Sequence, residues 1–77
     1  MDAEKTRMQS VFGIKDTEQK VINALQVHFD CKVVLRDDGT LTTSGRQALR
    51  RLSRLLEDLG AMTKDLDDTI VDMFYRV

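Results

Sequence analysis

Four arginines in the middle of the chain carry the strongest chemical signal in the sequence. Arg46, Arg50 and Arg54 recur at i, i+4 and i+8, the spacing that places side chains on one face of an α-helix, and Arg51 lies beside them. Guanidinium groups bind phosphates through paired hydrogen bonds, so such a row can follow a nucleic-acid backbone. The same spacing also fits a solvated helix face on which Arg54 pairs with Glu57. The pattern therefore predicts either a phosphate-binding face or a solvated one.

The other reactive side chains form no catalytic or metal-binding pattern. His28 is the only histidine and Cys31 the only cysteine, which excludes a histidine–cysteine zinc cluster and an intrachain disulfide. Asp65, Asp68 and Asp72 lie at i, i+3 and i+7, but without a calcium-binding loop they are better interpreted as a solvated helix face. We therefore expect no enzymatic activity, no metal and no cofactor, and we expect Cys31 to be a small apolar core residue.

A β-hairpin is expected just before the arginines. The segment Cys31–Leu35 is rich in β-branched residues, Asp37–Gly39 is a turn signal, and Thr40–Thr43 offers a second extended run. By the period of two, Val33 and Leu35 would point to one face of the hairpin and their neighbours to the other.

The arginines themselves belong to a predicted helix over about Ser44–Leu59. Threonine and serine hydroxyls at positions 42–44 can cap its start, and Gly60 marks its end. Leucines recur between these two signals at helical spacing, namely Leu49, Leu52, Leu55, Leu56 and Leu59.

Two further helices are predicted on either side of this unit. The first runs from about Thr17 to Phe29 and the last from about Lys64 to Tyr75. The first carries an apolar stripe of Val21, Ile22, Leu25 and Phe29. The last carries a stripe of Leu66, Ile70, Met73, Phe74 and Val77.

A chain of 77 residues is expected to form a single domain, residues 1–77, with a small core. Residues 1–12 are predicted to be a weakly structured N-terminal element, and residues 61–77 an additional C-terminal helix. A two-stranded hairpin needs further support, either helices on one face or a third strand from Thr6–Phe12 or from a second copy of the chain. The expected fold class is therefore α+β, with a β-hairpin or three-stranded sheet packed against two to three helices.

Charge is spread unevenly along the chain, although the formal net charge is only −1. Six basic residues face two acidic ones between Lys32 and Leu56, whereas two basic residues face four acidic ones from Ala61 to Val77. The sequence contains no apolar run long enough to span a membrane and no secretory signal pattern. With its single cysteine, the chain is expected in the cytoplasm, without membrane association.

The order of these elements resembles a KH-type nucleic-acid-binding module. The resemblance rests on residues 11–16, reading VFGIKD, followed by a helix, then on FDCKVV at residues 29–34, a turn, LTTSG at residues 41–45, and a helix. More narrowly, it is similar to the KH-like segment that precedes the ATPase domain of PhoH-like proteins. It covers about residues 8–59. The P-loop of that ATPase domain is absent from this sequence, so the resemblance implies no ATPase activity.

The resemblance implies that RNA or single-stranded nucleic acid is bound at a GXXG loop. In such loops, glycine lets the backbone approach phosphates closely. Gly13 matches the first glycine and Lys15 is a further phosphate contact, but Asp16 stands in place of the second glycine and its carboxylate repels phosphate. The predicted nucleic-acid-binding residues are thus Gly13, Lys15, Arg46, Arg50, Arg51 and Arg54.

The degenerate loop leaves a second hypothesis open. A KH-like unit would be complete by Leu59, so the apolar stripe of the last helix needs a surface to cover. It can pack on the rest of the domain, or it can bind a protein partner or a second copy in a homodimer. In that alternative the protein is an interaction module without nucleic-acid binding, and its interface residues are Leu66, Ile70, Met73 and Phe74.

Overall fold

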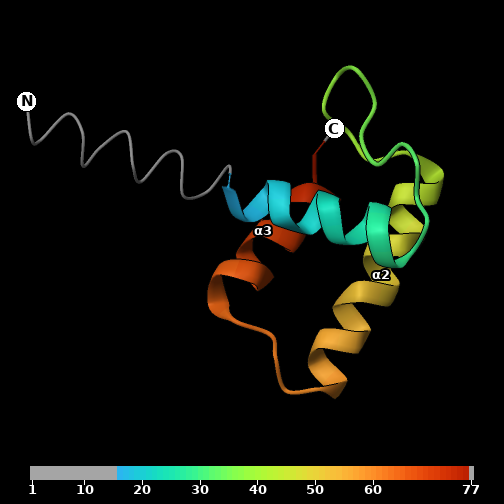
Figure 1. The fold of residues 1–77 in the computed structure, drawn as a ribbon. Helices are drawn as coiled ribbons and strands as arrows, with labels where there is room; N and C mark the ends of the chain where they lie inside the picture. Colours follow the sequence, from blue (N-terminus) through green and yellow to red (C-terminus); the bar gives the residue numbers. More distant parts are fainter. Residues whose placement is uncertain (1–15, 77) are drawn as a thin grey trace, which may run out of the picture.

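The computed structural model describes residues 16–76, which form three helices and the loops between them (Figure 1). Residues 16–28 belong to the first helix, α2 spans Thr43–Asp58, and α3 spans Lys64–Phe74. The first helix lies across α3 and ends beside the N-terminal half of α2, while residues 59–63 connect the far ends of α2 and α3 (Figure 1). Among the described residues, no helix combines the length and apolar character needed to cross a membrane.

The helices predicted over Ser44–Leu59 and Lys64–Tyr75 are confirmed with ends within one residue of those expected, and residues 16–28 of the predicted first helix are helical. Thr42 is the N-cap of α2, and its hydroxyl oxygen accepts a hydrogen bond from the backbone N–H of Gly45 at 2.9 Å. Leu59 is the C-cap of α2, and the following Gly60 has a positive φ of 67°, as is usual for glycine after a helix. Thr63 caps α3 in the same way as Thr42 caps α2, by accepting from the N–H of Leu66.

The predicted β-hairpin and the α+β fold class are wrong for the described residues. Within residues 16–76 the only β pairing is a single antiparallel bridge between Leu35 and Leu41, so there is no strand and no sheet. A tight turn at the expected place remains, in which the N–H of Arg36 donates to the carbonyl of Thr40 at 2.7 Å. The structure is therefore all-helical, with a turn in place of the KH-like sheet.

The start of α2 directly after Thr42 explains why the second arm of the hairpin is so short. The backbone N–H of Thr42 still donates to the carbonyl of Val34 at 3.0 Å, as it would in a ladder. The side chain of the same residue caps α2, which begins at the next position. The second arm therefore ends after Thr40–Thr42, and so short a pair does not form a sheet without a further strand. Residues 6–12, the predicted third strand, lie outside the described residues.

The core lies where the three helices and the segment before the turn meet. Leu25, Leu49 and Met73 contribute one fully buried side chain from each helix. Val34 also enters the core and is 2% exposed, whereas its neighbour Val33 is 59% exposed. Cys31 is buried, which confirms the prediction that it is a core residue. The complete core consists of Val21, Leu25, Cys31, Val34, Leu41, Ala48, Leu49, Leu52, Ile70 and Met73.

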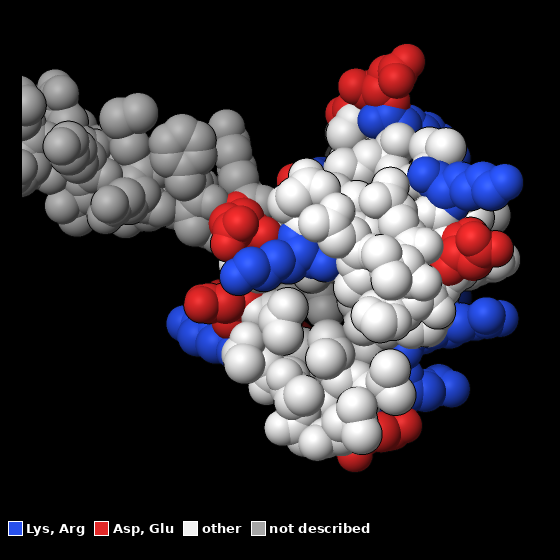
Figure 2. Space-filling view, viewed as in Figure 1, with Lys and Arg blue, Asp and Glu red and all other residues white. Residues whose placement is uncertain are grey.

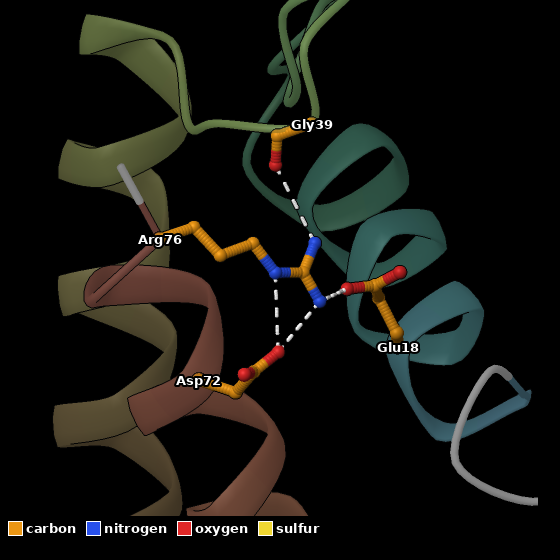
Figure 3. Close-up of polar contacts among 4 residues, drawn as sticks. All are labelled: Glu18, Gly39, Asp72 and Arg76. Atoms are coloured by element: carbon orange, nitrogen blue, oxygen red, sulfur yellow. Dashed lines mark hydrogen bonds and ion pairs between the residues drawn. The ribbon is translucent and has the colours of Figure 1, made fainter.

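Arg76, which directly follows the C-cap of α3, ties three parts of the chain together (Figure 3). Its guanidinium pairs with the carboxylate of Glu18 in the first helix and donates to Asp72 Oδ2 from Nε at 3.1 Å and from Nη2 at 2.7 Å. Nη1 donates to the carbonyl of Gly39 in the turn at 3.4 Å. Partial burial acts to lower the pKa of Arg76, but the bonds to Asp72 and Glu18 outweigh it and raise the pKa.

Candidate nucleic-acid interface

The predicted arginines lie on one side of the molecule. Arg50, Arg51 and Arg54 are exposed on α2, and Arg46 is half-buried where α2 approaches α3. Figure 2 shows several basic side chains, with acidic ones among them, projecting from the side of the molecule formed by α2 and the loop before it. The residues that hold α2 in this orientation are buried on its opposite face, namely Gly45, Ala48, Leu49 and Leu52.

The exposed arginines of α2 form no ion pair with an acid among the described residues. Within residues 16–76 the ion pairs are Lys20–Asp16, Arg76–Glu18 and Arg76–Asp72, so none involves an arginine of α2. The Arg54–Glu57 pair that a solvated face would offer is therefore not formed. The guanidinium groups of Arg50, Arg51 and Arg54 are free to bind an anion.

The order of charges along α2 is the reverse of the one that stabilises a helix. The N-terminal end of a helix favours acidic residues and the C-terminal end favours basic ones, because of the helix dipole. The first turn of α2 contains no acidic residue, and its last turn contains no basic residue. Instead, the acidic residues Glu57 and Asp58 lie at its C-terminal end. In α3, by contrast, Asp65 and Asp67 occupy the first turn. The helix dipole therefore does not account for the order of charges along α2.

Arg46 is the one member of the row with a partner on another helix. Its Cζ lies 5.7 Å from the centre of the Phe74 ring, which is a cation–π contact. The guanidinium keeps its positive charge in this contact, because the ring is uncharged. The contact also holds the start of the arginine row against the last turn of α3. Phe74 therefore positions this end of the row.

The glycine-loop residues of the prediction cannot be placed. Gly13 and Lys15 lie outside the described residues. Asp16, which replaces the second glycine of the loop, is exposed and pairs with Lys20 at 3.2 Å. Among the predicted nucleic-acid-binding residues, those the structure brings together are the four arginines of α2.

The predicted interface residues of α3 lie mostly inside the molecule. Ile70 and Met73 are core residues with 3% and 0% exposure. Leu66 and Phe74 are half-buried and pack against that core. These four side chains therefore come together as the part of α3 that packs against the rest of the domain.

No second reactive site appears elsewhere in the described residues. His28 is exposed at the end of the first helix, and Cys31 Sγ lies 3.7 Å from Ser44 Oγ and 3.5 Å from the carbonyl oxygen of Val33. Between residues 16 and 76 no group of three or more histidine, cysteine, aspartate or glutamate residues is placed to hold a metal ion.

Two features outside the predicted site are an ion-pair cluster around Arg76 and the exposed side chain of Tyr75. The i, i+4 spacing of Asp72 and Arg76 was a signal for their ion pair, but nothing in the sequence pointed to Glu18 as the third member. Tyr75, the C-cap of α3, is 80% exposed and directly follows Phe74.

Comparison of the chain with protein families, curated proteins and solved structures finds no match. The site is therefore interpreted from its own geometry.

Proposed function

We propose that this protein is a non-enzymatic module that binds RNA or single-stranded nucleic acid through the arginine face of α2, which consists of Arg46, Arg50, Arg51 and Arg54. The observation that carries the proposal is that Arg50, Arg51 and Arg54 are exposed and have no acidic partner within residues 16–76. Guanidinium groups at this spacing can each bind a phosphate of a nucleic-acid backbone. The free, buried Cys31 is consistent with a reducing compartment, and the proposal places this function in the cytoplasm.

A salt titration provides the first test. Each phosphate neutralised on a single strand contributes about 0.7 to the slope of log K against log salt concentration, so three or four arginines predict a slope of about −2 to −3. The measurement is fluorescence anisotropy of a short labelled oligoribonucleotide titrated with the full chain. Absence of binding even at low salt would overturn the proposal.

A matched pair of charge reversals then locates the site. Arg54→Glu, on the arginine face, is expected to weaken binding about tenfold, because it replaces a phosphate contact with a repulsive carboxylate. Lys64→Glu makes the same change in net charge at an exposed position at the start of α3. It is expected to weaken binding less than about twofold at physiological salt, where distant charges are screened. Equal losses in the two variants would argue against a site on α2.

The alternative function, a protein-interaction or homodimerisation module that uses α3, has less support. Ile70 and Met73 fill the core of the monomer, so their side chains are available to a partner only if α3 moves away. Sedimentation at micromolar concentration tests the alternative. A dimer that Phe74→Asp dissociates while the variant remains folded would favour it over nucleic-acid binding.

A further inference from the structure

We infer that Tyr75 is a base-stacking residue at one end of the arginine face, and that it selects single-stranded nucleic acid over duplex. The inference rests on the proposed function, since it assigns the class of ligand and a further contact residue to the same site. It is drawn from the exposure of Tyr75, its position next to Phe74 and the charges around it.

Tyr75 differs from the other aromatic residues of the described chain in its exposure. Phe29 and Phe74 are half-buried and pack against the core, whereas Tyr75 is 80% exposed. Within residues 16–76 the phenol of Tyr75 makes no hydrogen bond that would hold the ring in place for a structural purpose. A large exposed ring of this kind suits contact with a ligand, and nucleic-acid bases stack on such rings.

The contact between Arg46 and Phe74 brings Tyr75 to the arginine row. Cζ of Arg46 lies 5.7 Å from the centre of the Phe74 ring. The Cα atom of Tyr75 is about 3.8 Å from that of Phe74, because the two residues are consecutive in the chain. From Arg46 the row continues along α2 through Arg50 to Arg54, with about 6 Å of helix axis per step. The backbone of Tyr75 therefore lies next to the Arg46 end of the row, where we place the end nucleotide of a bound strand.

Arg76, the residue after Tyr75, offsets the charge of two carboxylates at this end of α3. Figure 3 shows its guanidinium between the carboxylates of Glu18 and Asp72, so neither carboxylate faces an incoming phosphate uncompensated. The other acids of α3 lie on earlier turns. The nearest, Asp68, is about 10 Å along the helix axis from Tyr75. Arg76 therefore reduces the negative charge that a phosphate meets at the end of α3, although the turn joined to it through Gly39 also carries Asp37 and Asp38.

Stacking on Tyr75 requires an unpaired base. In a duplex, each base is already stacked and paired, and opening it costs free energy, whereas the bases of a single strand are free to stack on an aromatic ring. A face of arginines alone would bind both forms through their phosphates. Tyr75 adds a contact that only the single strand can make.

The experiment uses the full chain and exploits the presence of a single tyrosine in the sequence. Its one pair of ring-proton signals is followed by NMR during titration with an unlabelled oligouridylate, and binding is measured separately by anisotropy. The ring protons are expected to shift upfield on binding, as occurs when a base stacks over the ring. Tyr75→Ala is expected to weaken single-strand binding about tenfold, and Tyr75→Phe, which keeps the ring, less than about twofold. Binding to a duplex of the same length should be equal for all three proteins.

The outcomes separate this inference from the proposed function. Binding that depends on Arg54 but is unchanged in Tyr75→Ala, or that leaves the tyrosine signals unshifted at saturation, overturns the role of Tyr75 and leaves the arginine face in place. Absence of any binding at low salt overturns both. Circular dichroism of the two Tyr75 variants verifies that they remain folded, which we expect because the side chain is exposed at the C-cap.

Discussion

Arg76, at the end of α3, forms an ion pair with Glu18 in the first helix, 58 positions earlier in the chain. The same guanidinium bonds Asp72 and the carbonyl of Gly39, so one side chain connects the first helix, the turn and α3 (Figure 3). Since the domain is small, a polar contact that joins three segments is a substantial part of what fixes their relative positions.

Replacing Arg76 should destabilise the domain measurably. Arg76→Ala leaves Glu18 and Asp72 without their shared partner, and we expect a loss of about 1 kcal/mol in the free energy of unfolding, since the pair is partly exposed. Urea denaturation followed by circular dichroism measures the loss, which should shrink at high salt. Arg51→Ala, which removes an unpaired arginine, serves as the control and should change stability by less than about 0.5 kcal/mol. Equal effects would show that the Arg76 contacts contribute nothing.

Gly45 is a helix position where alanine should destabilise rather than stabilise. A Cβ at this position would lie 2.4 Å from the carbonyl oxygen of Val34, a backbone atom that has little room to move. Alanine normally stabilises a helix relative to glycine by about 0.5–1 kcal/mol, but here we expect overpacking to cost about 1–3 kcal/mol. Thermal denaturation of Gly45→Ala tests this, with Gln47→Ala on the exposed face of α2 as the control. A raised melting temperature for Gly45→Ala would contradict the close packing of α2 on residue 34.

The turn should respond to acid through Asp38. The hydroxyl and the backbone N–H of Thr40 donate to its carboxylate at 2.6 and 2.9 Å and hold the pKa of Asp38 below its ordinary value. Because the folded pKa is the lower one, this carboxylate stabilises the turn above about pH 4 and the contribution is lost as the pH falls through the folded pKa.

An NMR titration of the Asp38 carboxyl carbon measures this pKa. Thr40→Val removes the hydroxyl, the larger of the two causes, and should raise the pKa towards its ordinary value. Thr43→Val is the control, because Thr43 is exposed in the first turn of α2, and it should leave the pKa of Asp38 low. If Asp38 has the same pKa in Thr40→Val as in the unmodified chain, the hydrogen bond from the Thr40 hydroxyl does not lower that pKa.

Met73 and Val71 offer a comparison between the two faces of α3. Met73 is fully buried, so Met73→Ala leaves a cavity and should cost about 2–5 kcal/mol, whereas Val71 is 45% exposed and Val71→Ala should cost less than about 1 kcal/mol. Urea denaturation of both variants measures the difference. If α3 instead packed against a partner and not against its own domain, the free energy of unfolding of Met73→Ala would depend on protein concentration.

The helices could be predicted from local sequence signals, and the β-hairpin could not. Hydroxyl caps at residues 42 and 63, a glycine at residue 60 and leucines at helical spacing each act within one or two turns of chain, so they are readable from the sequence. The β-branched run before the turn gave an equally clear local signal, but whether it forms a strand depends on a partner. Thr42 bonds Val34 through its backbone and caps α2 through its side chain, and the start of α2 at the next residue limited the pairing to one bridge.

The candidate site was predicted in part for the same reason. The helical spacing of Arg46, Arg50 and Arg54 placed them on one exposed side of α2, because a regular helix converts sequence spacing into direction. The spacing could not tell whether acids of the last helix would neutralise them, since that depends on how α2 and α3 pack. The Arg46–Phe74 contact likewise joins residues distant in sequence, and no local pattern announces it.

The sequence by itself determined three helices, the turn at Asp37–Gly39, a buried Cys31 and a row of arginines on one helix, because periodicity, caps and turn residues act over short range. Only the tertiary structure decided that the turn carries no sheet in residues 16–76 and that Val34 and not Val33 enters the core. It also decided that, among these residues, the arginines of α2 form no ion pair while Arg76 pairs with both Asp72 and Glu18. These outcomes depend on which surfaces meet when the helices pack, and that is settled by contacts between residues far apart in the chain.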